Sequence, residues 1–159
     1  MAKKGTTKYH STKQENKVAK EMNAKPVIGS GSLWGSKGDV RAEDYLIECK
    51  TTSKSFYSLR ADTWNKIERE AVKDGLRIPV MCIDLENGAY RLAVFKYNDV
   101  IVSGALQILS THDKSFRVEP NQIHYVVSMD SVRLHNCQPL RLVVVPWSDF
   151  LDAMNEEVI

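Results

Sequence analysis

Two acidic residues and a lysine in a short predicted hairpin are the strongest candidates for chemistry in this chain. The segment GDVRAEDYLIECK spans residues 38–50. If it folds back about a turn at its centre, Asp39 lies opposite Glu48, because opposed residues of paired strands share one face. Lys50, two residues after Glu48, falls on that face too. Cys49 then points to the opposite face, toward the core.

The same pairing sets Val40 opposite Ile47, and it holds whether the hairpin tip contains two residues or four. Two carboxylates facing each other in a sheet are destabilising unless something neutralises them. Mg²⁺ binds oxygen ligands and is commonly held by one or two carboxylates together with substrate phosphate. The pattern therefore predicts either a metal site with a lysine beside it or an ordinary exposed ion pair between Glu48 and Lys50.

The charge distribution is consistent with a polyanionic partner. Lys and Arg number twelve against six Asp and Glu in residues 1–60, and ten against fourteen in residues 61–159. Clustered positive charge attracts nucleic acid through its phosphates, although a lysine-rich solvated tail would have the same composition.

Composition restricts the class of protein. The chain has 159 residues, 43% hydrophobic and 26% charged, which suits one domain with a substantial core. No window reaches the roughly 18 apolar residues of a membrane span, and no apolar stretch follows the N-terminal lysines as in a secretory signal. Three cysteines, an odd number, favour a reduced, cytoplasmic protein. The missing apolar window predicts that it does not associate with membranes.

The N-terminal half is predicted to begin with a flexible basic arm over residues 1–11. A helix is expected from Thr12, as N-cap, to about Asn23, with Glu15 at the capping-box spacing. A Gly/Ser loop over residues 29–38 leads into the hairpin, whose strands are expected near 38–42 and 45–50.

The rest of the chain predicts a helix over 59–75 that buries Trp64, Ile67, Ala71 and Val72 and ends at Gly75. Further elements are expected as a β-hairpin over 78–95, a segment 98–109 that fits helix or strand, strands near 114–119, 124–129 and 139–146, and a helix 148–157 capped by Ser148. The fold class is α/β, on the border of α+β, with a mixed central sheet flanked by helices. Residues 12–159 form one domain, in which 96–159 are a β-rich extension of the 12–95 core.

Asp39, followed by Glu48-Cys49-Lys50, resembles the D…ExK core of the PD-(D/E)xK nuclease superfamily, with Gly38 in place of the family's proline. Over residues 12–95 the order of elements is similar to that of archaeal and phage-encoded Holliday-junction resolvases. The resemblance implies a restriction-endonuclease-like core, in which Asp39 and Glu48 bind Mg²⁺ and Lys50 assists the attacking water. Mn²⁺ is expected to substitute.

The resemblance also assigns roles outside the hairpin. Glu15 corresponds to the family's helix glutamate that helps to bind metal, with Glu21 as the alternative. Ser32 matches the active-site loop serine, with Ser30 as second choice. Trp34 either stacks on an unpaired base or anchors the loop to the core.

We therefore predict a Mg²⁺-dependent DNA endonuclease, with a Holliday junction or other branched DNA as substrate. Cutting both strands of a two-fold junction implies a homodimer, acting in a bacterial or archaeal cell or, if phage-encoded, in the host cytoplasm. The rivals are a nicking or restriction-like nuclease on duplex DNA and a non-catalytic DNA-binding module. The residues expected to contact DNA are Lys3, Lys4, Lys8, Lys13, Lys17, Ser30, Trp34, Lys37 and Lys54.

Overall fold

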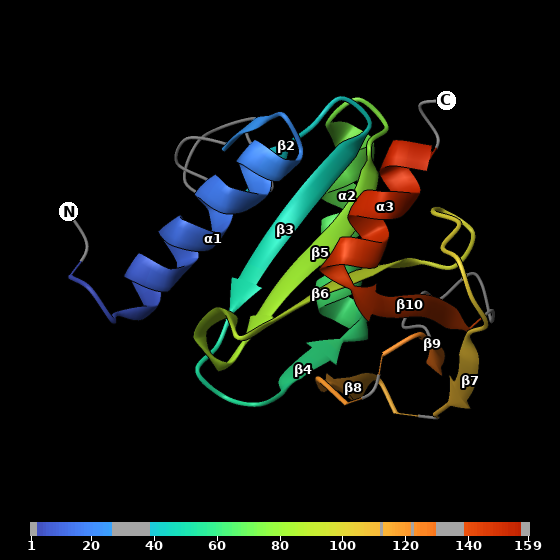
Figure 1. Ribbon diagram of the computed structural model, residues 1–159. Helices are drawn as coiled ribbons and strands as arrows, with labels where there is room; N and C mark the ends of the chain where they lie inside the picture. Colours follow the sequence, from blue (N-terminus) through green and yellow to red (C-terminus); the bar gives the residue numbers. More distant parts are fainter. Residues whose placement is uncertain (1–2, 27–38, 112, 122, 130–138, 157–159) are drawn as a thin grey trace.

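The computed structural model describes residues 3–26, 39–111, 113–121, 123–129 and 139–156, and within them the fold is a mixed β-sheet between helices (Figure 1). Eight strands form the main sheet in the order β1-β2-β3-β5-β6-β10-β9-β7. Two pairings, β3 with β5 and β7 with β9, are parallel, and the others are antiparallel. The predicted α/β class with a mixed central sheet is confirmed.

The helices are α1 (Thr7–Glu21), α2 (Ala61–Lys73) and α3 (Trp147–Glu156). The strands of the main sheet are β1 (Lys25–Pro26), β2 (Val40–Arg41), β3 (Tyr45–Thr51), β5 (Ile78–Leu85), β6 (Tyr90–Lys96), β7 (Gln107–Ser110), β9 (Tyr125–Met129) and β10 (Leu140–Pro146). Strands β4 (Tyr57–Arg60) and β8 (Ser115–Val118) pair with each other as a separate two-stranded ribbon.

The sheet separates two hydrophobic cores. On one face, α1 and α3 pack over alternate residues of β3, β5, β6 and β10, with Phe150 of α3 contacting Tyr45 and Phe95. On the other face, α2 places Trp64 and Ile67 against the remaining alternate residues, together with the inner side of the β4–β8 ribbon. Figure 1 shows α2 behind the sheet, with α1 and α3 in front of it. Both faces are buried, which explains the nearly continuous apolar runs of the central strands.

Helix α1 differs from its prediction. It begins at Thr7, and the side chain of Thr6 accepts a hydrogen bond from the Tyr9 N–H at 3.2 Å. Thr6 is therefore the N-cap, and the predicted N-cap, Thr12, lies inside the helix, so that residues 7–11 of the expected arm are helical. The five additional residues contribute little apolar periodicity, so the sequence pattern predicts a later start for the helix.

The C-terminal half contains further corrections. Segment 98–109 contributes only a short strand, β7, and α3 begins at Trp147, so that Ser148 lies in its first turn and is not the N-cap. Val72 of α2 is exposed, whereas the other predicted core positions of that helix are buried. Gly75 follows α2 with φ +80°, as expected of a C-terminal glycine. Strand β10 lies between β6 and β9, so the β-rich C-terminal region completes the main sheet.

Candidate active site

The β2–β3 hairpin has the predicted register. Val40 pairs with Ile47 and Arg41 with Leu46. Beyond Val40 the ladder changes: the Asp39 N–H donates to the Ile47 carbonyl at 3.0 Å, and the Cys49 N–H donates to Asp39 Oδ2 at 2.7 Å. The carboxylate of Asp39 thus binds the backbone of β3 directly, which holds this buried side chain beside the strand that carries Glu48.

Glu48 and Lys50 lie on the same side of β3, with Lys50 Nζ 3.3 Å from Glu48 Oε1. The Glu48 side chain is only 18% exposed. Burial is the main cause that raises the pKa of Glu48 to about 7, the charge of Asp39 raises it further, and Lys50 opposes the rise. Burial by itself lowers the pKa of Lys50, but Glu48, Tyr57 and Asp39 together outweigh it, so the pKa lies above its ordinary value. Glu48 is thus an acid that exchanges its proton near neutral pH.

Glu15 of α1 also interacts electrostatically with Asp39. Its Oε1 accepts a hydrogen bond from the Ser11 hydroxyl at 3.3 Å. Burial raises the pKa of Glu15, and the charge of Asp39 adds to the rise. Asp39 therefore raises the pKa of two glutamates, Glu15 from the helix and Glu48 from β3. The alternative helix residue, Glu21, is instead paired with Arg91, at 3.2 Å.

Asp39, Glu48, Lys50 and Glu15 form the carboxylate cluster. Two further residues that the sequence did not indicate as site residues border it. Gln14 of α1 is buried, and its Nε2 donates to the carbonyls of Lys50 and Cys82, each at 2.9 Å, which joins α1 to β3 and β5. Its position four residues before the core residue Val18 was the available signal. Tyr57 of β4 is half-buried and interacts electrostatically with Lys50, while burial raises its pKa. No local pattern identifies Tyr57, because β4 reaches the cluster through tertiary packing.

The oxygen donors fit a hard divalent cation at Asp39 and Glu48. Asp39 is buried and Glu48 is half-buried, and their carboxylates repel each other, which is the situation a bound Mg²⁺ or Mn²⁺ relieves. In the described part of the chain no three His, Cys, Asp or Glu side chains converge into a metal centre. Asp39 and Glu48 would hold a cation here, with water or substrate phosphate at its other positions.

The cysteine between the two site residues of β3 belongs to the core. Cys49 is buried on the α1 and α3 face, beside Cys82 of β5. Its hydrogen bond with Cys82 and its burial raise the pKa of the Cys49 thiol well above its usual range. The predicted core position of Cys49 is confirmed, and a thiol that stays protonated is a poor nucleophile.

The residues predicted to contact DNA lie partly in two described regions and partly outside the described residues. The lysines of the N-terminal segment (Lys3, Lys4, Lys8, Lys13 and Lys17) are exposed. Three of them, with Tyr9 and neighbouring polar residues, line a hollow of about 910 Å³ along α1. Lys54 lies just after β3, with its Nζ 5.6 Å from the centre of the Phe56 ring. The loop residues Ser30, Ser32, Trp34 and Lys37 lie outside the described residues.

Comparison of the chain with models of known protein families and with curated protein sequences gave no match. Among the residues that the structure describes, no helix is both long enough and apolar enough to span a membrane.

Proposed function

We propose that this protein is a metal-dependent DNA endonuclease with a restriction-endonuclease-like core, acting in the cytoplasm on branched DNA such as a Holliday junction. The observation that carries the proposal is the position of Asp39, which raises the pKa of Glu15 and Glu48 while Lys50 pairs with Glu48. Buried like charges are costly to maintain, and they recur at sites where a cation and a polyanionic substrate are bound.

Each residue has a defined part in this proposal. Asp39 and Glu48 would hold Mg²⁺, and Glu15 would complete the acidic cluster. A divalent cation supplies Lewis-acid chemistry, because it activates water and offsets the charge that develops on phosphorus. Lys50, held by Glu48, stabilises negative charge on the scissile phosphate. The Asp39–Cys49 hydrogen bond and the Gln14 bridge keep these strands in place while DNA binds.

The loop after Lys50 supports a DNA path beside the site. Two cations contact the ring of Phe56: Lys54 Nζ is 5.6 Å and Arg117 Cζ is 4.1 Å from its centre. Neither cation is paired with a carboxylate from the described ranges of the chain. An aromatic ring flanked by unpaired cations suits a strand of DNA, because bases stack on rings and phosphates bind cations.

The exposed lysines of α1 are proposed to contribute to DNA affinity, and the salt dependence of binding measures this contribution. If Lys8, Lys13 and Lys17 contact phosphates, replacing all three with Gln should reduce the slope of log affinity against log salt by about 2 to 3, at ~0.9 for each contact. The control is Lys66→Gln on the exposed side of α2, which should leave the slope unchanged. An unaltered slope in the triple variant would mean that these lysines are solvated and make no DNA contact.

The decisive experiment is cleavage of labelled four-way junction, flap and duplex by the full chain, in Mg²⁺, Mn²⁺ or EDTA. Wild type should cut the junction in either metal, and EDTA should stop it. Asp39→Asn keeps an oxygen that can accept the Cys49 N–H, so the fold should survive while cleavage is lost and DNA binding changes only a few-fold. Glu43→Gln, an exposed residue of the same hairpin, is the matched control and should cut normally.

The other outcomes separate the remaining functions. Equal cutting of junction and duplex would favour a nicking or restriction-like nuclease and remove the branched-DNA preference. Binding without cutting in either metal would favour the second candidate, a non-catalytic DNA-binding module. The exposed lysines along α1 and the hollow that three of them line are the observation that favours this candidate. The homodimer expected from junction symmetry is tested by light scattering with and without the junction.

A further inference from the structure

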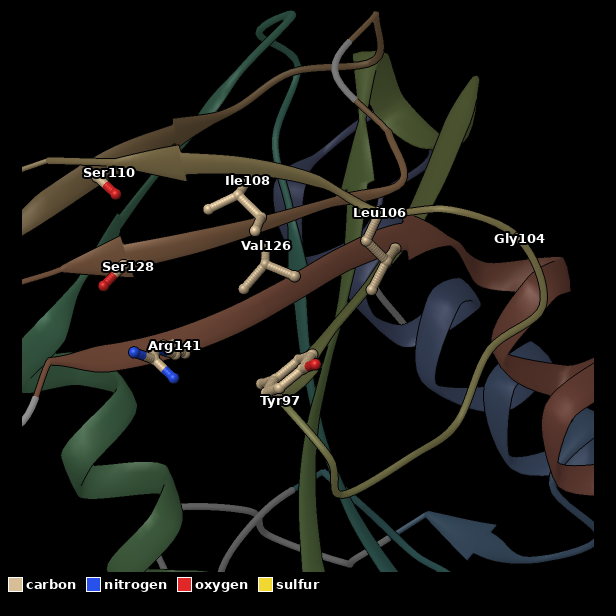
Figure 2. A pocket seen from close by; sticks show the side chains of 8 residues that line it. All are labelled: Tyr97, Gly104, Leu106, Ile108, Ser110, Val126, Ser128 and Arg141. Atoms are coloured by element: carbon tan, nitrogen blue, oxygen red, sulfur yellow. The ribbon is translucent and has the colours of Figure 1, made fainter.

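A cavity of about 490 Å³ lies on the part of the sheet that no described helix covers. It sits over β10, β9 and β7, beyond α3, and the chain between β6 and β7 borders it through Tyr97, Gly104 and Leu106 (Figure 2). In the strand order, β5, β6 and β10 separate β9 from β3, so the cavity is distinct from the carboxylate cluster. Its volume is within the range of small-molecule sites.

The three strands align the lining of this cavity into two rows. Arg141 pairs with Ser128, and Ser128 pairs with Ser110, so that one guanidinium and two hydroxyls form a line across β10, β9 and β7. Two residues before the serines on each strand, Val126 of β9 pairs with Ile108 of β7, and these two side chains form an apolar row. Figure 2 shows the three polar side chains together on one side of the cavity, and the apolar ones away from them.

The polar row has donors that no described residue of the chain engages. Within the described ranges Arg141 has no carboxylate partner, and neither serine hydroxyl has a hydrogen-bond partner. In the apolar row Val126 is buried, whereas Ile108 is 76% exposed and offers apolar surface to a ligand. A ligand that fits both parts therefore has an anionic head and an apolar body.

We propose that this cavity binds a small molecule that carries a phosphate on a flat apolar group, of the size of an aryl phosphate or a nucleoside monophosphate. Arg141 presents a planar fork that binds two oxygens of one anion. Neighbouring strands lie ~4.8 Å apart, so Ser128 and Ser110 can reach a third oxygen of the same group. Phosphate has that third terminal oxygen and a carboxylate does not. The flat body lies against Val126, Ile108 and the ring of Tyr97.

The test is a titration of the isotope-labelled full chain followed by amide NMR shifts, with phenyl phosphate as the probe. Inorganic phosphate and phenol are the two part-probes, and benzoate replaces the phosphate by a carboxylate. Phenyl phosphate should shift the amides of β7, β9 and β10 and bind at least ten-fold more tightly than either part-probe or benzoate. Equal binding of benzoate would overturn the assignment of phosphate.

Two variants test the residues. Arg141→Gln, at an exposed position, should weaken phenyl phosphate binding at least ten-fold, and Arg69→Gln on the exposed side of α2 is the control that should not change it. Ser110→Ala at the edge strand should weaken binding several-fold, and it serves if Arg141→Gln fails to fold. Wild-type affinity in both variants, shifts outside these strands, or no saturation by about 10 mM phenyl phosphate would overturn the site.

Discussion

Replacing Glu48 by Gln should remove a pH-dependent loss of stability that the wild-type protein shows without metal. The pKa of Glu48 rises from 4.5 to about 7 in the folded protein, because burial and Asp39 disfavour the charged form. The folded state therefore holds this proton more tightly than the unfolded state, and the free energy of unfolding falls as pH rises from about 4.5 to about 7. The two pKa values differ by about 2.5, and each pKa unit corresponds to ~1.4 kcal/mol. The free energy of unfolding therefore falls by something on the order of 3 kcal/mol.

The assay is urea denaturation in EDTA at about pH 5 and about pH 8, where Glu48 is protonated and ionised respectively. Glu48→Gln resembles the protonated wild type at both pH values, so at about pH 8 it should be more stable than wild type by roughly 2 to 3 kcal/mol. Glu43→Gln, exposed in the same hairpin, should follow wild type. If Glu48→Gln loses as much stability as wild type between the two pH values, the electrostatic account of the site is wrong.

Urea denaturation of the same two proteins in the presence of Mg²⁺ tests the metal site. At about pH 8, Mg²⁺ should raise the stability of wild type, because a ligand that binds only the folded state stabilises it and this one also offsets the repulsion between Asp39 and Glu48. Glu48→Gln should gain little. Equal gains in both proteins would place the bound metal elsewhere in the chain.

Three predictions concern the elements that support the site. Thr6→Ala should lower the free energy of unfolding by about 1 kcal/mol through loss of the α1 cap, whereas Thr12→Ala, inside the helix, should change it by no more than about 0.5 kcal/mol, both measured by urea denaturation. Ile67→Ala should cost roughly 2 to 5 kcal/mol, and Val72→Ala on the exposed side of α2 less than about 1 kcal/mol; similar costs would contradict the burial of α2. Gln14→Ala should cost about 1 to 3 kcal/mol and speed amide hydrogen exchange in β3 and β5, because two carbonyls lose their donor; unchanged exchange would refute the bridge.

Several parts of this molecule follow from local sequence alone. The register of the β2–β3 hairpin could be counted outward from its turn, and strand alternation then places Glu48 and Lys50 on one face and Cys49 on the other. Helix α2 and its terminal Gly75 were also predictable, because helical spacing and a left-handed terminal residue are short-range signals. The fold class followed from the order of such elements.

The arrangement of distant segments was decided only by tertiary structure. The contacts of Gln14 and Tyr57 with Lys50 of β3 depend on how α1 and β4 pack against that strand, which no short-range pattern specifies. The row of Arg141, Ser128 and Ser110 likewise exists because β10, β9 and β7 became neighbours. Short-range patterns determine backbone conformation and which face of each element is apolar. The choice of neighbours depends on burying those faces together, which involves residues far apart in the chain.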